Sequence, residues 1–522
     1  MKWLFKLMLP ALVLVSCSEE AASPVEFGPS STTGEEEVVT HGMIRLGSKL
    51  PNPYSLPNVC KALETLYPTR SATGLDPTDL YVRFLPKDEG QFALLSESGI
   101  ELFDHPLDYS LAVDGDYYHD PSVPDGEITW QYAVVPAGFS FPPGIVHEVL
   151  DECFIPREET RAGGFEDVDW ETVERKAFEI TGNGAMLSEQ TRGRVKPSGR
   201  ITIKDEKLGK AVGVSGVKMV ANVFVRVSTT HTDAAGNYSF SSKFSARPHY
   251  RICFQNSAGF SIGLNLVLVQ ASVSTLGKDD PEGISVTVDK NSDNTLFRRC
   301  VVNNAAYDFI NNCSAYGMSA PPRNLRLWIM NIVRPSCTVM LHHGALLDSK
   351  LVSNYLGVYK VLVRIFAPDI VVGSKGKNGD YFELYSSTLH EMAHASHYSK
   401  VGSSYWNKFA TYVLSSYLAT GSCYGSGNGE NAGYCAVGEM WAYYVEGMLD
   451  KGRYGVNPGH GSGLWFHPEI LWTLEEGGVP RRDICSAFRS GVTDVDALKA
   501  ELVSVCPSKK TMINQTFSKY LR

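Results

Sequence analysis

The chain has 522 residues, of which 43% are hydrophobic and 20% are charged. This is ordinary globular usage, and the length exceeds what one hydrophobic core usually organises, so we expect two to four domains. The formal charge is -9, from 48 basic and 57 acidic residues. Binding to a phosphate backbone needs a basic surplus, so the composition argues against nucleic acid as a partner.

The chain begins like an export signal. A basic start and an apolar stretch at 7–15, too short to span a bilayer as a helix, lead into Leu14-Val15-Ser16-Cys17. This tetrapeptide resembles the lipobox of bacterial lipoproteins. The resemblance implies that residues 1–16 are a signal peptide and that a lipidated Cys17 anchors the protein to a membrane. Ser18-Glu19-Glu20 resembles the acidic tag of surface lipoproteins, so we expect outer-membrane attachment, facing the cell surface or else the periplasm.

Two domains are expected after a flexible tether at 17–42, which is rich in Ser, Thr, Pro, Gly and Glu. Residues 43–190 contain strand-like runs among Pro-rich stretches and predict a mixed α/β domain of unknown role. Residues 195–275 alternate apolar and polar side chains, as at Ile201 and Ile203, and predict a small antiparallel β-sandwich.

The predicted sandwich contains Thr232-Asp233-Ala234-Ala235-Gly236-Asn237-Tyr238-Ser239-Phe240 and, upstream, Gly216-Val217-Lys218. These segments resemble carboxypeptidase regulatory-like sandwiches of the transthyretin type. In that family the module is a non-catalytic spacer or binding unit, and this is what the resemblance implies here.

Ten cysteines remain besides Cys17, and disulfides are chemically permitted in an exported protein. The pairs Cys300 with Cys313, Cys423 with Cys435 and Cys485 with Cys506 are the first candidates, because each closes a short loop. Free buried thiols are the alternative.

The residues that carry chemistry lie in 280–522, where buried-looking strands precede long amphipathic helices. His390-Glu391-Met392-Ala393-His394 matches the HExxH motif, and the absence of Gly and Pro from 383–399 permits a helix. Histidines one turn apart can both ligate Zn²⁺, while Glu391 can take a proton from a water whose acidity the metal has raised. Two solvated histidines on a helix surface are the alternative interpretation.

A catalytic zinc site needs a third protein ligand. His397 lies about 10.5 Å along the helix axis from His390 and cannot share an ion with it unless the helix breaks. A later predicted helix carries Glu439, Tyr443 and Glu446 opposite its apolar stripe, on a face that points either to solvent or into a cleft over the HExxH helix. Glu439 is the favoured ligand, with Glu446 and Glu430 as alternatives.

The HExxH motif, followed 45 positions after His394 by Glu439, resembles the gluzincin metallopeptidases and predicts a mainly helical, zincin-like C-terminal domain. The resemblance implies that Glu439 is the third ligand, that Glu391 is the general base and that a Tyr or His stabilises the oxyanion. Tyr443 stands where thermolysin-like enzymes carry Asp, so it is either the oxyanion donor or a partner of Glu439.

Together these features predict a multidomain α+β protein that acts as a lipid-anchored zinc metallopeptidase on extracellular proteins or peptides. The rival hypothesis is a non-catalytic surface lipoprotein that binds a protein or a glycan and has a structural or inactive zinc site. The intact Glu391 favours the enzyme, because a structural site has no use for a carboxylate beside its first ligand.

A strand near 361–372 is a candidate for the sheet edge that receives a peptide.

Overall fold

The computed structural model describes residues 42–521 apart from 70–71, 73, 125–126, 158–164, 166, 189–194, 264–270, 331–335, 346–366, 375–379, 421 and 457–462. The predicted signal peptide, Cys17 and nearly all of the predicted tether lie outside these residues. No helix within the described ranges is long and apolar enough to cross a membrane.

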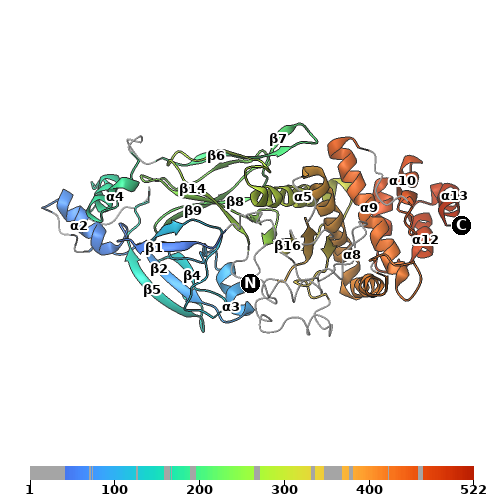
Figure 1. The fold of residues 1–522 in the computed structure, drawn as a ribbon, viewed down its shortest axis with the longest axis horizontal. Coiled ribbons are helices and arrows are strands. Elements are labelled where there is room, and N and C mark those ends of the chain that lie inside the picture. The colour runs from blue at the N-terminus through green and yellow to red at the C-terminus, as the bar shows by residue number, and fades with distance from the viewer. Residues whose placement is uncertain are drawn as a thin grey trace, which may run out of the picture.

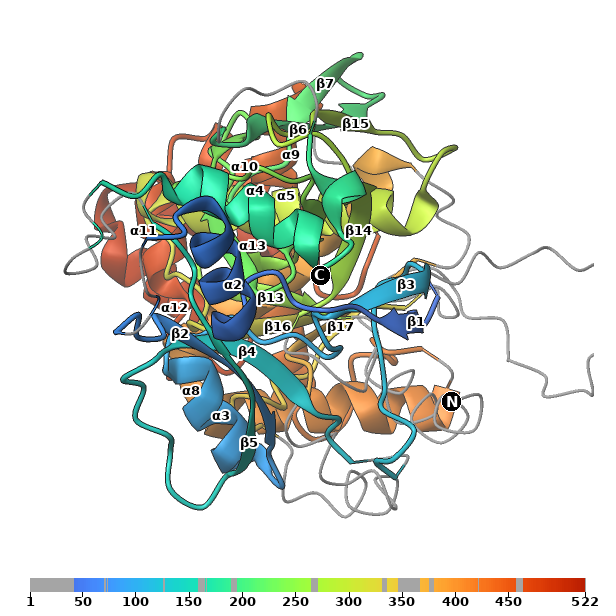
Figure 2. The same ribbon diagram turned by 90° about the vertical axis from the view of Figure 1, so that its left-hand side faces the viewer.

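The N-terminal unit combines two small sheets with three helices and occupies one end of the molecule (Figure 1). Its antiparallel sheet has the order β4-β2-β5, and a separate ribbon pairs β1 with β3. Helices α2 and α4 pack side by side at the outer end (Figure 2). The bounds are β1 (Arg45–Lys49), α2 (Leu56–Leu66), β2 (Asp79–Leu85), α3 (Glu89–Glu97), β3 (Tyr109–Val113), β4 (Gln131–Pro136), β5 (Val146–Cys153) and α4 (Trp170–Ile180).

The middle of the chain forms two sheets, of order β10-β6-β15, with β7 paired to β6, and β14-β11-β8-β9. Apolar side chains of these strands, such as Ile203, Met219 and Ile252, are buried in the core, and nearly every residue of β8 and β11 is buried. The bounds are β6 (Ser198–Asp205), β7 (Lys210–Gly213), β8 (Lys218–Val223), β9 (Arg226–His231), β10 (Asn237–Ser239), β11 (His249–Cys253), β14 (Val273–Lys278) and β15 (Val286–Val288).

The C-terminal region contains a five-stranded sheet of order β12-β13-β16-β18-β17. Its strands are β12 (Gln255–Asn256), β13 (Phe260–Gly263), β16 (Leu325–Met330), β17 (Cys337–Thr338) and β18 (Ile370–Gly373). Strands β13, β16 and β18 are parallel, and β17 is an antiparallel edge strand. Two of these strands, β12 and β13, come from within the stretch expected to form the sandwich, so the chain visits this sheet before β14 and β15 return to the middle sheets.

Seven helices of the described C-terminal residues pack on this sheet and on one another, which confirms the expected helical C-terminal region. They are α5 (Asn294–Tyr316), α8 (Tyr381–Thr420), α9 (Ala432–Tyr454), α10 (Glu469–Glu476), α11 (Arg481–Ala487), α12 (Val495–Val505) and α13 (Lys510–Tyr520). Helix α8 contacts α5, α9, β17 and β18, and it changes direction at Gly402, whose φ is 80°. Glycine adopts this left-handed conformation without the usual steric cost.

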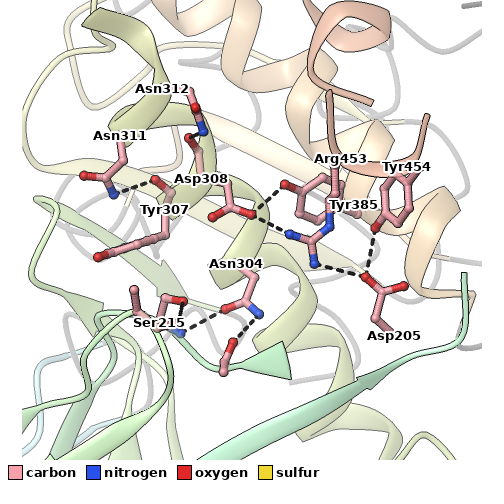
Figure 3. Close-up of polar contacts among 12 residues, drawn as sticks. Asp205, Ser215, Asn304, Tyr307, Asp308, Asn311, Asn312, Tyr385, Arg453 and Tyr454 are labelled. Atoms are coloured by element: carbon pink, nitrogen blue, oxygen red, sulfur yellow. Dashed lines mark hydrogen bonds and ion pairs between the residues drawn. The ribbon is translucent and has the colours of Figure 1, made fainter. Parts of the chain in front are cut away.

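A polar cluster joins the middle sheets to the helices α5, α8 and α9 (Figure 3). At the end of α9, Arg453 donates to Asp205 of β6 at 3.0 Å and to Asp308 of α5 at 2.9 Å. The Tyr385 hydroxyl of α8 also donates to Asp308, at 2.7 Å. The Arg453 guanidinium on α9 therefore links α5 of the C-terminal region to β6 of the middle sheets.

Replacing Arg453 with methionine is expected to lower the free energy of unfolding by about 3 kcal/mol, because the fully buried Asp205 would lose its cationic partner. Urea denaturation of the purified protein measures this change. The exposed Lys451, on the same helix turn, provides the control: Lys451→Met should change stability by less than about 0.5 kcal/mol. Equal effects of the two substitutions would contradict a clamping role for Arg453.

The cysteine pairing expected from the sequence is not found. The ten cysteines in the described part of the chain form no disulfide with one another, and all but Cys60 are buried. Cys300 and Cys313 both lie on α5, where 13 residues of helix separate them by about 20 Å along the axis. A disulfide requires Cα atoms within about 7 Å, so this pairing was wrong.

Candidate metal centre

Helix α8 presents the HExxH motif to the interior, as the sequence predicts. Leu389, Met392 and Ala393 are fully buried, and they fix the helix against its neighbours. His390 and His394 stand one turn apart on the adjoining face, and both are buried, as is Glu391. The alternative interpretation of two solvated histidines on a helix surface is therefore wrong.

Helix α9 packs along α8 and brings Glu439 to the two histidines. Both of its faces are buried, so the polar face with Glu439 and Glu446 points at α8 rather than at solvent. The Trp441 indole donates to the Ala393 carbonyl at 2.8 Å and fixes the two helices relative to each other. Gly438 permits the close approach, since a Cβ atom there would lie 2.8 Å from the Phe409 ring.

One ligand atom from each of the three side chains lies within 4.8 Å of the others, close enough to share a metal ion. Nε2 of His390 lies 3.4 Å from one Glu439 carboxylate oxygen, and Nε2 of His394 lies 3.5 Å from the other. Ligands bonded at about 2.0 to 2.1 Å in tetrahedral geometry are about 3.3 to 3.4 Å apart. Among the described residues no fourth His, Cys, Asp or Glu joins this group.

The donor atoms of this group have no hydrogen-bond partner within the described residues. This holds for Nε2 of both histidines and for both carboxylate oxygens of Glu439, all of which are buried. A metal ion satisfies such lone pairs and removes the cost of leaving them unpaired. His390, His394 and Glu439 therefore form a candidate metal-binding site with two imidazoles and one carboxylate.

Glu446 orients the first ligand. Its carboxylate accepts a hydrogen bond from Nδ1 of His390 at 3.0 Å, which holds the ring with Nε2 facing Glu439. Such partners fix the tautomer and raise the basicity of a metal-binding imidazole. The structure thus distinguishes two residues that the sequence left as alternatives. Glu439 belongs to the ligand group, and Glu446 binds the far nitrogen of the His390 ring.

The substitution Glu446→Gln is expected to weaken metal affinity by about 10- to 100-fold, because the neutral amide holds the His390 imidazole less firmly. Competition with a fluorescent zinc chelator measures the dissociation constant. Glu383 on the exposed side of α8 offers the control, since Glu383→Gln leaves every contact of the group intact. Equal affinity in the two variants would remove Glu446 from the site.

Without a metal ion, the buried histidine carries a proton at neutral pH. Burial disfavours the imidazolium of His390, but the Glu439 and Glu446 carboxylates outweigh it and raise its pKa to about 10. Burial likewise opposes the charge of Glu439, yet the imidazoles of His394 and His390 hold its pKa at about 2. At pH 7 the site therefore contains one proton that a metal ion must displace.

Metal binding near pH 7 is accordingly expected to release about one proton per ion, and affinity is expected to fall about tenfold for each pH unit below the pKa of His390. Calorimetric titration in buffers of different ionisation enthalpy counts the proton. Binding without proton release would contradict the protonated His390.

Glu391 lies next to the ligand group along the chain, and its carboxylate is held by the sheet edge. The Thr338 hydroxyl of β17 donates to its carboxylate at 2.7 Å and also lies 3.0 Å from its backbone carbonyl. Burial raises the pKa of Glu391. A carboxylate with a raised pKa beside a metal site is suited to accept a proton and return it.

Tyr443 lies one turn after Glu439, with its ring 4.7 Å from the His390 ring in an edge-to-face contact. Its hydroxyl forms a 2.8 Å hydrogen bond with the Tyr424 hydroxyl. The side chain therefore borders the ligand group, with a phenolic oxygen held by a second tyrosine.

The other residues considered from the sequence lie elsewhere. Glu430 is exposed in the loop before α9. Helix α8 stays regular until Gly402, so His397 does not join the ligand group. The His397 ring is buried and contacts the rings of Tyr405, Trp441 and Phe488. Of the stretch 361–372, the described part includes the start of β18, which is an interior strand, so the edge is β17.

Sequence reasoning did not find Thr338, since no local motif marks a residue that reaches Glu391 through sheet pairing.

A comparison with family models, with characterised proteins and with solved structures finds no match for this chain. The class that fold and site define is therefore a mixed α+β protein with a buried candidate metal centre of two histidines and one glutamate.

Proposed function

We propose that the protein is a zinc-dependent metallopeptidase. The observation that carries this proposal is the convergence of His390, His394 and Glu439, whose ligand atoms lack hydrogen-bond partners and lie within 4.8 Å of one another, beside a glutamate that is not part of the ligand group. Two imidazoles and one carboxylate suit zinc, and three protein ligands are the number that catalytic zinc sites use.

A bound zinc ion supplies Lewis acidity, which lowers the pKa of water and polarises a carbonyl group. The chain's own residues do the rest of the chemistry. Glu391 takes a proton onto its carboxylate oxygen from the attacking water and delivers it to the nitrogen of the leaving amine. Thr338 holds the Glu391 carboxylate at the sheet edge, and Glu446 holds His390. Tyr443 is the proposed hydrogen-bond donor to the oxyanion.

A broad peptide library, analysed by mass spectrometry after incubation with the purified mature chain, tests the proposal. Cleavage that stops after chelation and returns with zinc supports a peptidase. No cleavage by fully zinc-loaded protein would leave the rival hypothesis, a binding protein with a structural zinc site.

We further propose that a lipid on Cys17 attaches the enzyme to the outer membrane, in line with the lipobox-like sequence and the polar tether. Its substrates would then be extracellular proteins or peptides. Mass spectrometry of the N-terminal peptide tests this: a free amino terminus at another residue would contradict the anchor.

A further inference from the structure

Strand β5 forms an outer edge of the sheet in the N-terminal unit. The sheet has the order β4-β2-β5, so β5 pairs with β2 on one side only. On its other side, only Cys153 at the end of the strand is paired among the described residues, through a bridge to Ser55. Figure 1 shows β5 along the outer margin of this unit. The outward backbone groups of 146–149 are therefore open to another strand.

Three apolar side chains of β5 are exposed to solvent. Val146, Val149 and Leu150 have exposed fractions of 42%, 49% and 38%. The described residues contain only three other large apolar side chains with an exposed fraction of 38% or more, and those three lie on separate segments of the chain. Single exposed apolar residues are ordinary, whereas several together on one surface mark an interaction site.

The regular part of this edge runs from Val146 to Val149. These residues lie in register with Leu85 to Val82 of β2, and Leu150 is an extra residue that interrupts the ladder. Successive side chains of a strand point to opposite faces of the sheet, so Val146 and Val149 lie on opposite faces. A strand added at this edge would therefore find an apolar neighbour on each face.

The N-terminal unit is strongly acidic. Residues 43–190 contain 26 Asp and Glu but only 10 Lys and Arg, which gives a formal charge of -16, compared with -9 for the whole chain. On β5 itself, Glu148, Asp151 and Glu152 are acidic, and among the described residues only Glu148 has an ion-pair partner, Arg83 at 2.6 Å. A surface of this charge attracts a basic partner and repels an acidic one.

We propose that the outer edge of β5 binds an extended, basic segment of a partner protein by strand addition. The backbone of this segment would pair with 146–149, and its apolar side chains would pack beside Val146 and Val149. Its Lys or Arg side chains would lie near Asp151 and Glu152. Pairing with β5 of a second copy is disfavoured, because it would bring together two units of the same strong charge. No residue of the metal centre takes part, so this proposal is independent of the proposed function.

The probe is the peptide acetyl-Lys-Val-Lys-Val-Lys-Val-Lys-amide with a fluorescent label, titrated with the purified protein and followed by fluorescence anisotropy. The protein carries Glu391→Gln throughout, so that hydrolysis does not remove the probe. We expect saturable binding with a dissociation constant below about 1 mM in about 50 mM salt, where charges are weakly screened. A peptide with Glu in place of every Lys should bind at least about tenfold more weakly.

A third peptide separates strand pairing from charge attraction alone. It has the sequence of the probe with N-methyl groups on its three central residues. These groups keep the charges and the side chains but remove the backbone donors that strand pairing needs. The methylated peptide should also bind at least about tenfold more weakly than the probe.

Val149→Lys tests the surface of the protein itself. This substitution removes an apolar contact and places a positive charge beside the bound peptide, so affinity should fall at least about tenfold. Leu94→Lys is the matched control, because Leu94 of α3 has an exposed fraction of 50%, close to the 49% of Val149, and the change in charge of the unit is the same. The control should bind the probe within about threefold of the parent protein.

Thermal unfolding shows whether each variant is folded, and Val146→Lys replaces Val149→Lys if the latter is not. No saturable binding of the probe, equal binding of the methylated peptide, or equal affinity of the Lys variants at Val149 and Leu94 would each overturn the proposal. Sedimentation velocity of the protein without peptide is expected to show no dimer that depends on β5. A dimer that Val149→Lys dissociates would assign this edge to a second copy and would also overturn the proposal.

Discussion

Replacing Glu391 with glutamine is expected to lower peptide hydrolysis by about 10²- to 10⁴-fold while zinc content stays at about one ion per chain. The amide has nearly the same shape as the carboxylate and can still contact the Thr338 hydroxyl, but it cannot accept the proton of the attacking water. Zinc stays bound because Glu391 does not belong to the ligand group. The rate of cleavage of a substrate found in the peptide library, together with metal analysis, measures both quantities.

Glu383→Gln is the matched control, since it removes one carboxylate from the exposed side of the same helix. It should retain both activity and zinc. If Glu391→Gln cleaves peptides as fast as the control does, the catalytic role of Glu391 is refuted.

Replacing Glu439 with alanine is expected to lower zinc content from about one ion per chain to below about 0.1, because two histidines alone leave the ion with too few protein ligands. Mass spectrometry of the metal content after dialysis against a weak chelator measures this loss. His394→Ala should behave in the same way, as the second ligand of the group.

The control for Glu439 is Glu430, which the sequence left as an alternative ligand and the structure places in an exposed loop. Glu430→Ala should keep its zinc. Retention of zinc by Glu439→Ala and loss by Glu430→Ala would mean that α9 does not supply the third ligand.

The local part of this site could be predicted from the sequence. The HExxH spacing and the Pro-free stretch around it predict a helix with His390 and His394 on one face, and α8 has this geometry. The apolar stripe of α9 likewise predicts that helix. Local periodicity could not decide whether Glu439 faces solvent or α8, because that choice depends on the Trp441 contact and on the close approach at Gly438.

The non-local part could not be predicted. Thr338 reaches Glu391 only because β17 pairs with β18 at the sheet edge, and β13 joins the same sheet by parallel pairing with β16. Pairings between distant segments leave no periodic signal in either strand. The expected Cys300 to Cys313 disulfide was wrong for a related reason: proximity in sequence becomes distance in space once α5 forms as a continuous helix.

The most direct test of the central claim is anomalous diffraction at the zinc edge from crystals of the protein grown with one equivalent of zinc. We expect one peak, bonded to Nε2 of His390, Nε2 of His394 and a carboxylate oxygen of Glu439 at about 2.0 to 2.2 Å, with a non-protein ligand completing the coordination. The absence of a peak between these residues, or a fourth protein ligand closing the site, would contradict the account.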